Sequence, residues 1–300
     1  MGNKTEKELL SLTNDYVFRR IFGDMNVPAL TEFLAAVLDI TVEELGELTV
    51  NDPHLHRKHK GGKSNELDIL VRSKSGEIMN VEIQVNPQPA FRERLAYLNA
   101  RFYADQMKRG QEYQMLRRTV TVVIADFNLI EENEDWYNKF QWYNPKYGTS
   151  LTYAQEIVVL DLTKLPKEDD GSALWKWMKF IKSGREDEME ELAKKNNAMQ
   201  EVVHTLRAMS DDEYERMLAF QRDKEERDRL GQITYGRLEG LAKGLAEGLA
   251  EGKAEGKAEG KAEGKAQAKN EIALNMLEEG ISVEVIARVT GLDAEEIRKL

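Results

Sequence analysis

Apolar residues recur at helical spacing in three stretches of the first 110 residues, and each stretch predicts a helix. The first covers residues 16–22 and follows Thr13 or Asn14, either of which can cap its amino end. Pro28 opens the second helix. The third helix is long and covers residues 89–110.

Four runs between and after these helices have the composition of strands. Residues 67–72 and 78–85 alternate in polarity and are separated by five residues of turn character, so they predict a hairpin. Residues 119–127 form a nearly continuous β-branched run, as in a strand buried on both faces, and residues 154–162 are similar. Strands and helices that alternate around a buried strand predict an α/β fold.

The character of the sequence changes along the chain and predicts four regions. Residues 1–183 hold all four tryptophans and form the packed domain, and residues 184–232 form charged amphipathic helix. Residues 233–267 carry a spacer with glycine at every fourth position, and residues 268–300 form a small helical tail.

The glycine repeat, from Gly236 to Gly264, suits a regular helix poorly. A period of four residues drifts by about 40° per step against the helical turn, so the glycines cannot hold one face. Each glycine costs about 1 kcal/mol relative to alanine, and glutamates four residues apart repel each other. We expect a marginal helix or a semi-flexible spacer, with an oligomerising coil as the alternative. Charged residues between the glycines exclude a membrane helix pair.

Composition narrows the class of protein. Hydrophobic residues make up 41% of the 300 residues, which allows a sizeable core, and 32% are charged. The absence of cysteine excludes disulfide scaffolds, thiol catalysis and cysteine zinc sites. The longest apolar run, residues 33–38, is far too short for a bilayer span, and no leader segment opens the sequence. We therefore expect a soluble, cytoplasmic protein that does not use a membrane.

The net charge of −11 argues at first against a nucleic-acid partner. The distribution of charge along the chain matters more than the sum. Residues 91–118 contain seven basic and three acidic side chains, and a locally basic face can contact phosphates in an otherwise acidic protein. The overall charge therefore does not decide the partner.

The two strands of the predicted hairpin place acidic residues on one face. Asp68 and Glu82 alternate with apolar neighbours, and a five-residue loop centred on Ser75 puts them directly opposite each other. Opposed Cβ atoms lie about 5 Å apart. Two carboxylates this close repel each other unless a cation lies between them.

A hard divalent cation such as Mg²⁺ takes carboxylate and carbonyl oxygens, and it can activate a water molecule for attack on a phosphodiester. Asp68 and Glu82 would be ligands of this metal, and the backbone carbonyl of Ile83 would be a third. Gln84 would orient the attacking water. The alternative is a solvated hairpin face that carries two incidental acids. Spacing alone leaves both interpretations open.

Asp68, followed by the EIQ of residues 82–84, resembles the D…(E)xK/Q signature of the PD-(D/E)XK nuclease superfamily. The segment NDYVFRRIFGD at residues 14–24 is similar to the amino-terminal signature of the Rpn family, the recombination-promoting nucleases or transposase-like proteins. Further segments that look like this family are LDIL at residues 67–70, NVEIQV at residues 80–85, the helix with Arg94, Tyr97 and Tyr103 that ends near Gly110, the glycine repeat, and IARVTGL at residues 286–292.

The resemblance implies a restriction-endonuclease-like PD-(D/E)XK core, in which helices flank a mixed central sheet, with a helical C-terminal extension. It also implies a metal-dependent DNA endonuclease. Members of the family are linked to recombination, horizontal gene transfer and phage defence.

The chain departs from the superfamily pattern in two places. The residue that is usually lysine is Gln84, which is neutral, so stabilisation of developing negative charge would fall to Arg94 or another basic residue. Many members also carry an acid on the first helix. Glu32 is the expected equivalent and a further metal ligand, with Asp15 and Asp24 as alternatives.

A segment rich in histidine and lysine precedes the hairpin. His54, His56 and His59 have a spacing that a zinc site could use, but the neighbouring basic residues would repel a cation. We expect this loop to contact phosphate, with plain solvent exposure as the alternative. The residues expected to contact DNA are Arg94, Lys58, Lys60 and Lys63.

A group of aromatic side chains and the C-terminal tail are two further candidates for contact with DNA. Trp136, Trp142, Tyr143 and Tyr147 could stack on bases, but packing in the core or in a flap is the interpretation that we favour. The tail at residues 268–300 resembles a helix-turn-helix, which can bind DNA. Its own acidic charge fits protein contact at least as well.

These features together predict a metal-dependent endonuclease that acts on double-stranded DNA, with Mg²⁺, Mn²⁺ or another divalent cation as cofactor. One chain offers one metal site, so cutting both strands favours a homodimer. The alternative is a non-catalytic DNA-binding or adaptor protein that retains the nuclease fold and binds DNA without turnover.

Overall fold

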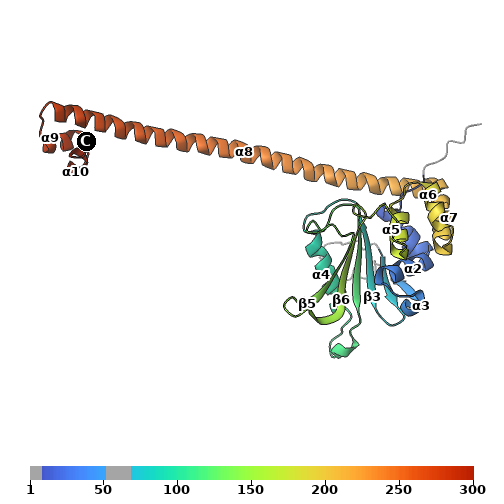
Figure 1. Ribbon diagram of the computed structural model, residues 1–300. Coiled ribbons are helices and arrows are strands. Elements are labelled where there is room, and N and C mark those ends of the chain that lie inside the picture. Colours follow the sequence, from blue (N-terminus) through green and yellow to red (C-terminus); the bar gives the residue numbers. More distant parts are fainter. Residues whose placement is uncertain (1–8, 52–68) are drawn as a thin grey trace, which may run out of the picture. The chain divides into compact units, whose positions relative to one another are not determined.

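The computed structural model describes residues 9–51 and 69–300. The chain divides into two compact units, the first ending at Glu226 and the second running from Arg227 to Leu300. The first unit contains the sheet and the helices that cover it (Figure 1). The helices of the second unit are the remainder of α8 (Glu213–Glu278), α9 (Val283–Thr290) and α10 (Ala294–Ile297).

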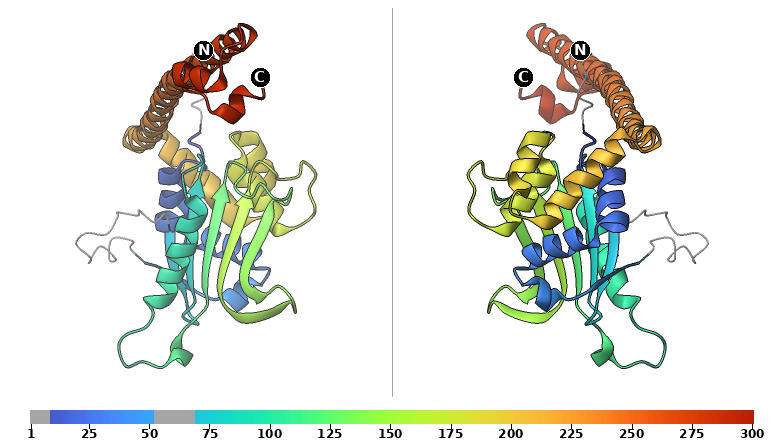
Figure 2. Two further views of the ribbon diagram at one scale, coloured as in Figure 1. Left: turned by 90° about the vertical axis from the view of Figure 1, so that its left-hand side faces the viewer. Right: turned by 90° about the vertical axis from the view of Figure 1, so that its right-hand side faces the viewer.

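The first unit is built around a six-stranded sheet with the order β1-β2-β3-β4-β6-β5, whose strands lie side by side in Figure 2. The pairs β1–β2, β2–β3 and β5–β6 are antiparallel, whereas β3–β4 and β4–β6 are parallel. This mixed sheet confirms the predicted α/β class. The strands are β1 (Leu48–Asn51), β2 (Ile69–Ser73), β3 (Ile78–Gln84), β4 (Thr119–Ala125), β5 (Tyr137–Asn144) and β6 (Thr149–Asp161).

Strand β4 lies inside the sheet, and all seven of its residues are buried, as its β-branched run predicts. Its side chains alternate between two layers. Val122 and Ile124 enter the main core. Val123 and Ala125 enter a smaller cluster with residues of α4 (Phe91–Ala104). The sheet is therefore covered on both faces.

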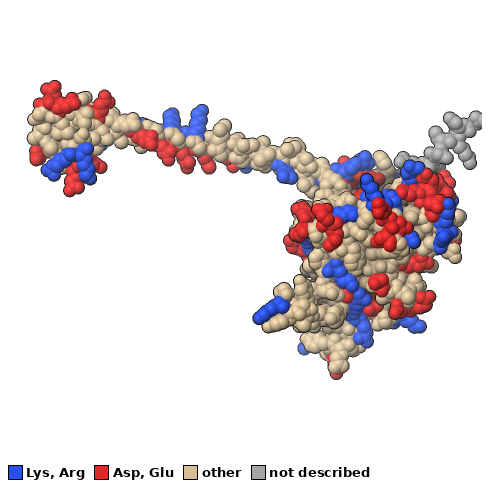
Figure 3. Space-filling model, viewed as in Figure 1, with Lys and Arg blue, Asp and Glu red and all other residues tan. Residues whose placement is uncertain are grey.

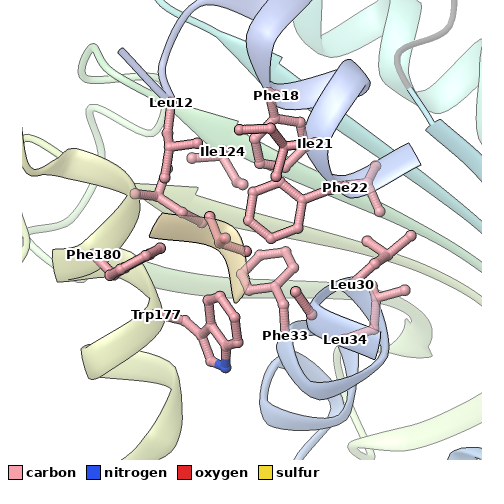
Figure 4. Packing of buried hydrophobic residues seen from close by; sticks show 14 of the residues in the cluster. Leu12, Phe18, Ile21, Phe22, Leu30, Phe33, Leu34, Ile124, Trp177 and Phe180 are labelled. Carbon is pink, nitrogen blue, oxygen red and sulfur yellow. The ribbon is translucent and has the colours of Figure 1, made fainter. Parts of the chain in front are cut away.

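The main core joins helices from both ends of the first unit. Figure 4 shows Phe22, Phe33 and Trp177 facing one another, with ring centroids 6.1 to 6.5 Å apart. In Figure 1, α2, α5 and α7 lie on one side of the sheet and α4 on the other. The helices that precede or follow the strands are α1 (Asp15–Phe18), the π-helical η1 (Arg19–Met25), α2 (Val27–Leu38), α3 (Val42–Leu45), α5 (Ala173–Lys182), α6 (Glu186–Ala193) and α7 (Asn197–Asp211).

Local sequence determines where the first helices begin and end. Asn14 caps α1, because its Oδ1 accepts a hydrogen bond from the Val17 N–H at 3.1 Å. The predicted first helix is therefore present, as α1 followed directly by η1. Pro28 lies in the first turn of α2, as expected. That helix ends at Asp39, whose φ of 55° is in the left-handed region.

The main core also takes in helices that follow residue 183. Met189 of α6 and Val202 and Leu206 of α7 are buried in it. The predicted division at residue 183 marks a change in sequence character, since α6 and α7 are amphipathic and strongly charged. Their apolar faces nevertheless pack on the same core, so the packed unit continues into the start of α8.

The glycine repeat is helical throughout, within the 66 residues of α8. The structure thus has a continuous helix where we expected a marginal helix or a spacer. Most of the residues between the glycines are alanine, glutamate, lysine or leucine, which have high helix propensity. A Cβ added at Gly252 or Gly256 would meet nothing within 4 Å, so these glycines fill no tight contact in the chain itself.

The C-terminal helices form a small core of their own. Ala273, Ile286 and Ile297, from α8, α9 and α10, are fully buried against one another. Gly280 and Gly291 stand between these helices with φ angles of 79° and 69°, which favour glycine. Residues 268–300 are thus helical, as the sequence indicated, and these two glycines separate the three helices.

Helix length and polarity bear on membrane spanning. Within residues 9–51 and 69–300, no single helix is both long and apolar enough to cross a bilayer. The bent pair Asp15–Met25 and Val27–Leu38 meets the criteria of length and composition only when its halves, at 105° to each other, are taken together. The apolar side chains of this pair are largely buried in the main core.

Candidate active site

Strand β3 sends alternate side chains to the two faces of the sheet. Met79, Val81 and Ile83 enter the main core. Asn80 and Glu82 point to the other face, toward α4, and are 0% and 4% exposed. A carboxylate buried this deeply requires hydrogen-bond donors or an opposite charge beside it.

Glu82 has both kinds of partner. Nδ2 of Asn80 donates to its Oε1 at 3.0 Å, and Nη2 of Arg94 donates to its Oε2 at 3.2 Å. Burial nevertheless raises the pKa of the Glu82 carboxyl above its usual range, although the charge of Arg94 and both hydrogen bonds act to lower it. The ionised carboxylate is therefore incompletely compensated, and a further positive charge beside it would be favourable.

Arg94 connects Glu82 to Gln84 through a chain of side chains. Its Nη1 donates to Oε1 of Gln88 at 2.9 Å, and Nε2 of Gln88 donates to Oε1 of Gln84 at 2.9 Å. The guanidinium carbon lies 4.8 Å from the ring centroid of Phe91, a cation–π contact that helps to orient it. Three side chains singled out in the sequence are thus brought into one network.

The register of β2 and β3 is the one expected from the five-residue turn. Ile69 pairs with Val81, and the paired residues are arranged symmetrically about Ser75. This register is the one that the predicted pairing of Asp68 with Glu82 requires. Asp68 itself lies outside the described residues.

Glu32 does not lie beside Glu82. Its Oε2 accepts a hydrogen bond of 2.7 Å from Nδ2 of Asn196, the N-cap residue of α7. Helix α2 packs on the main-core face of the sheet, whereas Glu82 points to the opposite face. The expectation that Glu32 is a ligand of the same metal is therefore corrected, because helical periodicity does not tell which face of the sheet a helix covers. The two alternatives pair elsewhere, Asp15 with Arg222 and Asp24 with Arg20.

The basic loop before β2 falls outside the described residues. The phosphate contacts expected of this loop therefore stay predictions, and so does the alternative of a zinc site. The residues concerned are His54, His56, His59, Lys58, Lys60 and Lys63.

Several arginines of the locally basic stretch 91–118 are paired with carboxylates. Arg92 binds Glu132 through hydrogen bonds of 2.8 and 2.6 Å, which lower the pKa of that carboxyl to about 2. Arg118 pairs with the buried Glu156 at 2.8 Å. The other such pairs are Arg94 with Glu82 and Arg101 with Asp105. This part of the surface is therefore less positive than the count of charges in the sequence indicated.

The oxygens around Glu82 are of the kind that hard divalent cations prefer. Oδ1 of Asn80 is buried next to the Glu82 carboxylate and has no hydrogen-bond partner among residues 9–51 and 69–300. The described residues contain no group of three or more histidine, cysteine, aspartate or glutamate side chains that could hold a metal ion. The residues present thus fit part of a metal site, and a complete site would need a further acid.

Sequence patterns did not identify Asn80 or Gln88 as site residues. Asn80 occupies the same alternating polar positions as Glu82 and Gln84, and this alternation could have found it. Gln88 lies in the connection between β3 and α4 and carries no periodic signal. Only the fold brings its amide between Arg94 and Gln84.

The mixed sheet, its helical layers and the buried glutamate on β3 define an α/β fold of the nuclease type. The family model of the PD-(D/E)XK nuclease family transposases matches residues 12–236. A second model, the C-terminal HTH domain of the Rpn/YhgA-like nuclease family, matches residues 266–300. The chain therefore belongs to the PD-(D/E)XK nuclease family transposases and carries the Rpn/YhgA-like C-terminal domain, which confirms the resemblance noted in its sequence. No curated protein and no solved structure matches the chain.

Proposed function

We propose that the protein is a metal-dependent endonuclease that hydrolyses phosphodiester bonds in double-stranded DNA. Its membership of a nuclease family supports the reaction class. The observation that carries the proposal is the environment of Glu82, a buried and incompletely compensated carboxylate at the second acidic position of the family signature. Burying such a group costs stability, which is typical of functional sites.

In this proposal Asp68, Glu82 and the backbone carbonyl of Ile83 hold a divalent cation, Mg²⁺ or Mn²⁺. The cation, when bound, would activate a water molecule and polarise the phosphate. Two features of the chain support its place beside Glu82: the raised pKa of that carboxyl and the unpartnered Oδ1 of Asn80. Gln84 orients the attacking water through its side-chain amide.

Arg94 takes the role that lysine has in most of the superfamily. Its guanidinium is permanently charged and can bind a phosphate through two parallel hydrogen bonds. The side chain is 32% exposed, so a substrate can reach it while it contacts Glu82. Gln88 and Phe91 hold the guanidinium in place. We propose that Arg94 neutralises the charge that develops on the phosphate.

The C-terminal helix-turn-helix supports duplex DNA as the substrate, because such domains place a helix in the major groove. We propose that it positions the nuclease on DNA, with residues 233–267 as the connection. A homodimer would supply the second site that cutting both strands needs. We also propose that the protein is cytoplasmic and that it acts in recombination, gene transfer or phage defence. The tail would in addition make protein contacts.

Cleavage of supercoiled plasmid by the full chain tests this function. We expect nicked and linear products with MgCl₂ and none with EDTA. Glu82→Gln and Asp68→Ala should each lower the rate at least about a hundredfold, because each removes a proposed metal ligand. Glu32→Gln is the matched control, since that carboxylate pairs with Asn196 and not with the site.

Two results would contradict the proposal. The first is plasmid cleavage by Glu82→Gln at the rate of the unaltered chain, which would remove Glu82 from the site. The second is tight DNA binding without cleavage under any divalent metal, which would favour the alternative, a non-catalytic DNA-binding adaptor that retains the nuclease fold.

A further inference from the structure

The hairpin of β5 and β6 lies at the edge of the sheet and exposes aromatic rings. Trp142, Tyr147 and Tyr153 are 57%, 67% and 69% exposed. The other exposed large apolar side chains of this hairpin are Phe140, Tyr143 and Leu151. We expected these aromatic residues to pack in the core or in a flap. The half-buried Trp136 contacts the main core, whereas Trp142, Tyr143 and Tyr147 are exposed on the edge hairpin and do not enter the core.

The pairing of β5 with β6 is irregular where the exposed rings lie. Phe140 pairs with Ile157, but register shifts on either side of Trp142 place Trp142 opposite Thr152. Such irregularities bend and twist a strand locally and are typical of sheet edges.

The charge of the hairpin differs from that of the rest of the chain. Residues 136–155 contain two lysines and no acidic residue, in a protein with 54 acidic residues. Lys146 Nζ lies 5.0 Å from the ring centroid of Tyr147 at the tip. In Figure 3 the free end of this hairpin is tan and blue, without red. The free end of the hairpin, with its exposed aromatic rings, Lys146 and no acidic residue, is complementary to bases and phosphates.

We propose that the β5–β6 hairpin binds single-stranded DNA by stacking unpaired bases on Trp142, Tyr147 and Tyr153. Every base offers a face for such stacking, so this contact needs no particular sequence. Lys146, which lies at the exposed tip, contacts the phosphates of the same strand. Lys139 is paired with the buried Glu156 at 3.9 Å and is not needed for this contact. This proposal depends on the proposed function in one respect only: the single-stranded DNA would come from duplex DNA that the nuclease has cleaved or distorted, which exposes unpaired bases.

The hairpin is separate from the chemistry. Glu82 lies on β3, and β4 and β6 separate that strand from β5. The hairpin therefore acts as a binding surface, and its contribution can be measured without cleavage. This separation lets the test of the hairpin succeed or fail independently of the nuclease reaction.

The test is fluorescence anisotropy of a labelled oligothymidylate of about 20 nucleotides, titrated with the full chain in EDTA. We expect Trp142→Ala and Tyr153→Ala each to weaken binding roughly tenfold, equivalent to about 1.4 kcal/mol. Tyr235→Ala is the matched control, because that tyrosine is 70% exposed on α8 and lies outside the hairpin. Its affinity should equal that of the unaltered chain.

The intrinsic fluorescence of Trp142 gives a second readout. Trp175 and Trp177 are almost fully buried and Trp136 packs against the main core, so quenching by the oligonucleotide should come mainly from the exposed Trp142 and should be much reduced in Trp142→Ala. Unaltered affinity in both hairpin variants would overturn the proposal. Unaltered affinity together with a lower sedimentation coefficient in those variants would instead make the hairpin an interface between copies of the chain. The binding assay in EDTA does not depend on cleavage, so the outcome of the Glu82→Gln plasmid experiment does not affect the interpretation of the hairpin variants.

Discussion

Asn80 uses only one end of its side-chain amide. Its Nδ2 donates to Glu82, while its buried Oδ1 has no hydrogen-bond partner in the part of the chain that the structure describes. A buried carbonyl without a hydrogen-bond partner lowers stability. This cost would be recovered if a ligand such as a divalent cation bound to the Asn80 oxygen. Arg94 has a similar feature, because its buried Nε also lacks a hydrogen-bond partner among the described residues. The residues around Glu82 are thus incompletely satisfied on two sides.

The substitution Asn80→Asp tests this environment. It replaces a donor to Glu82 by a second carboxylate, so we expect the free energy of unfolding in EDTA at pH 7.5 to fall by about 2 to 3 kcal/mol. Repulsion raises the pKa of the pair, and stability is then lost as pH rises through the raised pKa. Stability should therefore recover as the pH is lowered toward 4.5, the ordinary value of glutamate. Urea denaturation at several pH values measures both effects.

A divalent cation distinguishes a metal site from a merely polar one. MgCl₂ should restore part of the stability lost in Asn80→Asp, because the cation separates the two carboxylates. Asn138→Asp is the control, since the Nδ2 of Asn138 donates to the exposed backbone of Asp135. An equal response of both variants to MgCl₂ would show that the effect is general screening.

The glycine repeat forms a regular helix although few interactions stabilise it. Its residues are exposed along α8, so no packing within the described chain stabilises the helix there. The helix depends on the propensity of the residues between the glycines. Single substitutions in the repeat should therefore change the stability of this part of α8 only through helix propensity, because no side-chain contacts are gained or lost.

Alanine in place of glycine should stabilise this part of α8. Gly252→Ala and Gly256→Ala add a Cβ that meets nothing within 4 Å, and each should contribute about 1 kcal/mol to local helix stability. Slower amide hydrogen exchange across the repeat is the measurement. Gly291→Ala is the contrasting control, because its φ of 69° is left-handed, and it should destabilise the tail. Faster exchange in the first two variants would show that the repeat needs its glycines for a contact.

At the scale of the whole molecule, the main core and the small core of the tail lie in two different compact units. The main core contains Leu206, and the small core of the tail contains Ile286, both fully buried. Each core joins elements of its own unit, so the two units are expected to unfold separately. The nuclease family model covers the first unit, and the model of the C-terminal HTH domain lies within the second.

Scanning calorimetry of the full chain should therefore resolve two transitions. Leu206→Ala should lower the first unit's midpoint alone, and Ile286→Ala that of the second, with a cost of about 2 to 5 kcal/mol in each case. The two variants act as controls for each other. A single transition that moves as a whole in both variants would show that the units unfold together.

Much of the local structure followed from the sequence because it depends on near neighbours in the chain. Asn14 and Pro28 define the start of the first two helices, and Gly280 and Gly291 divide the tail. The turn centred on Ser75 determined the register of β2 and β3, because a period of two residues leaves little freedom once one face is buried. The family signature and the position of Glu82 on β3 could likewise be predicted from the sequence, because both depend only on residues that are close together in the chain.

Only the tertiary structure decided which of these residues meet. It joined Arg94 to Glu82 through the fold of α4 over the sheet, and it placed Glu32 on the opposite side. It also paired Arg92 with Glu132, forty residues away, and left Trp142 exposed at the edge of the sheet. Contacts between residues distant in sequence depend on which face of the sheet each element covers, and periodicity within one element carries no information about that choice.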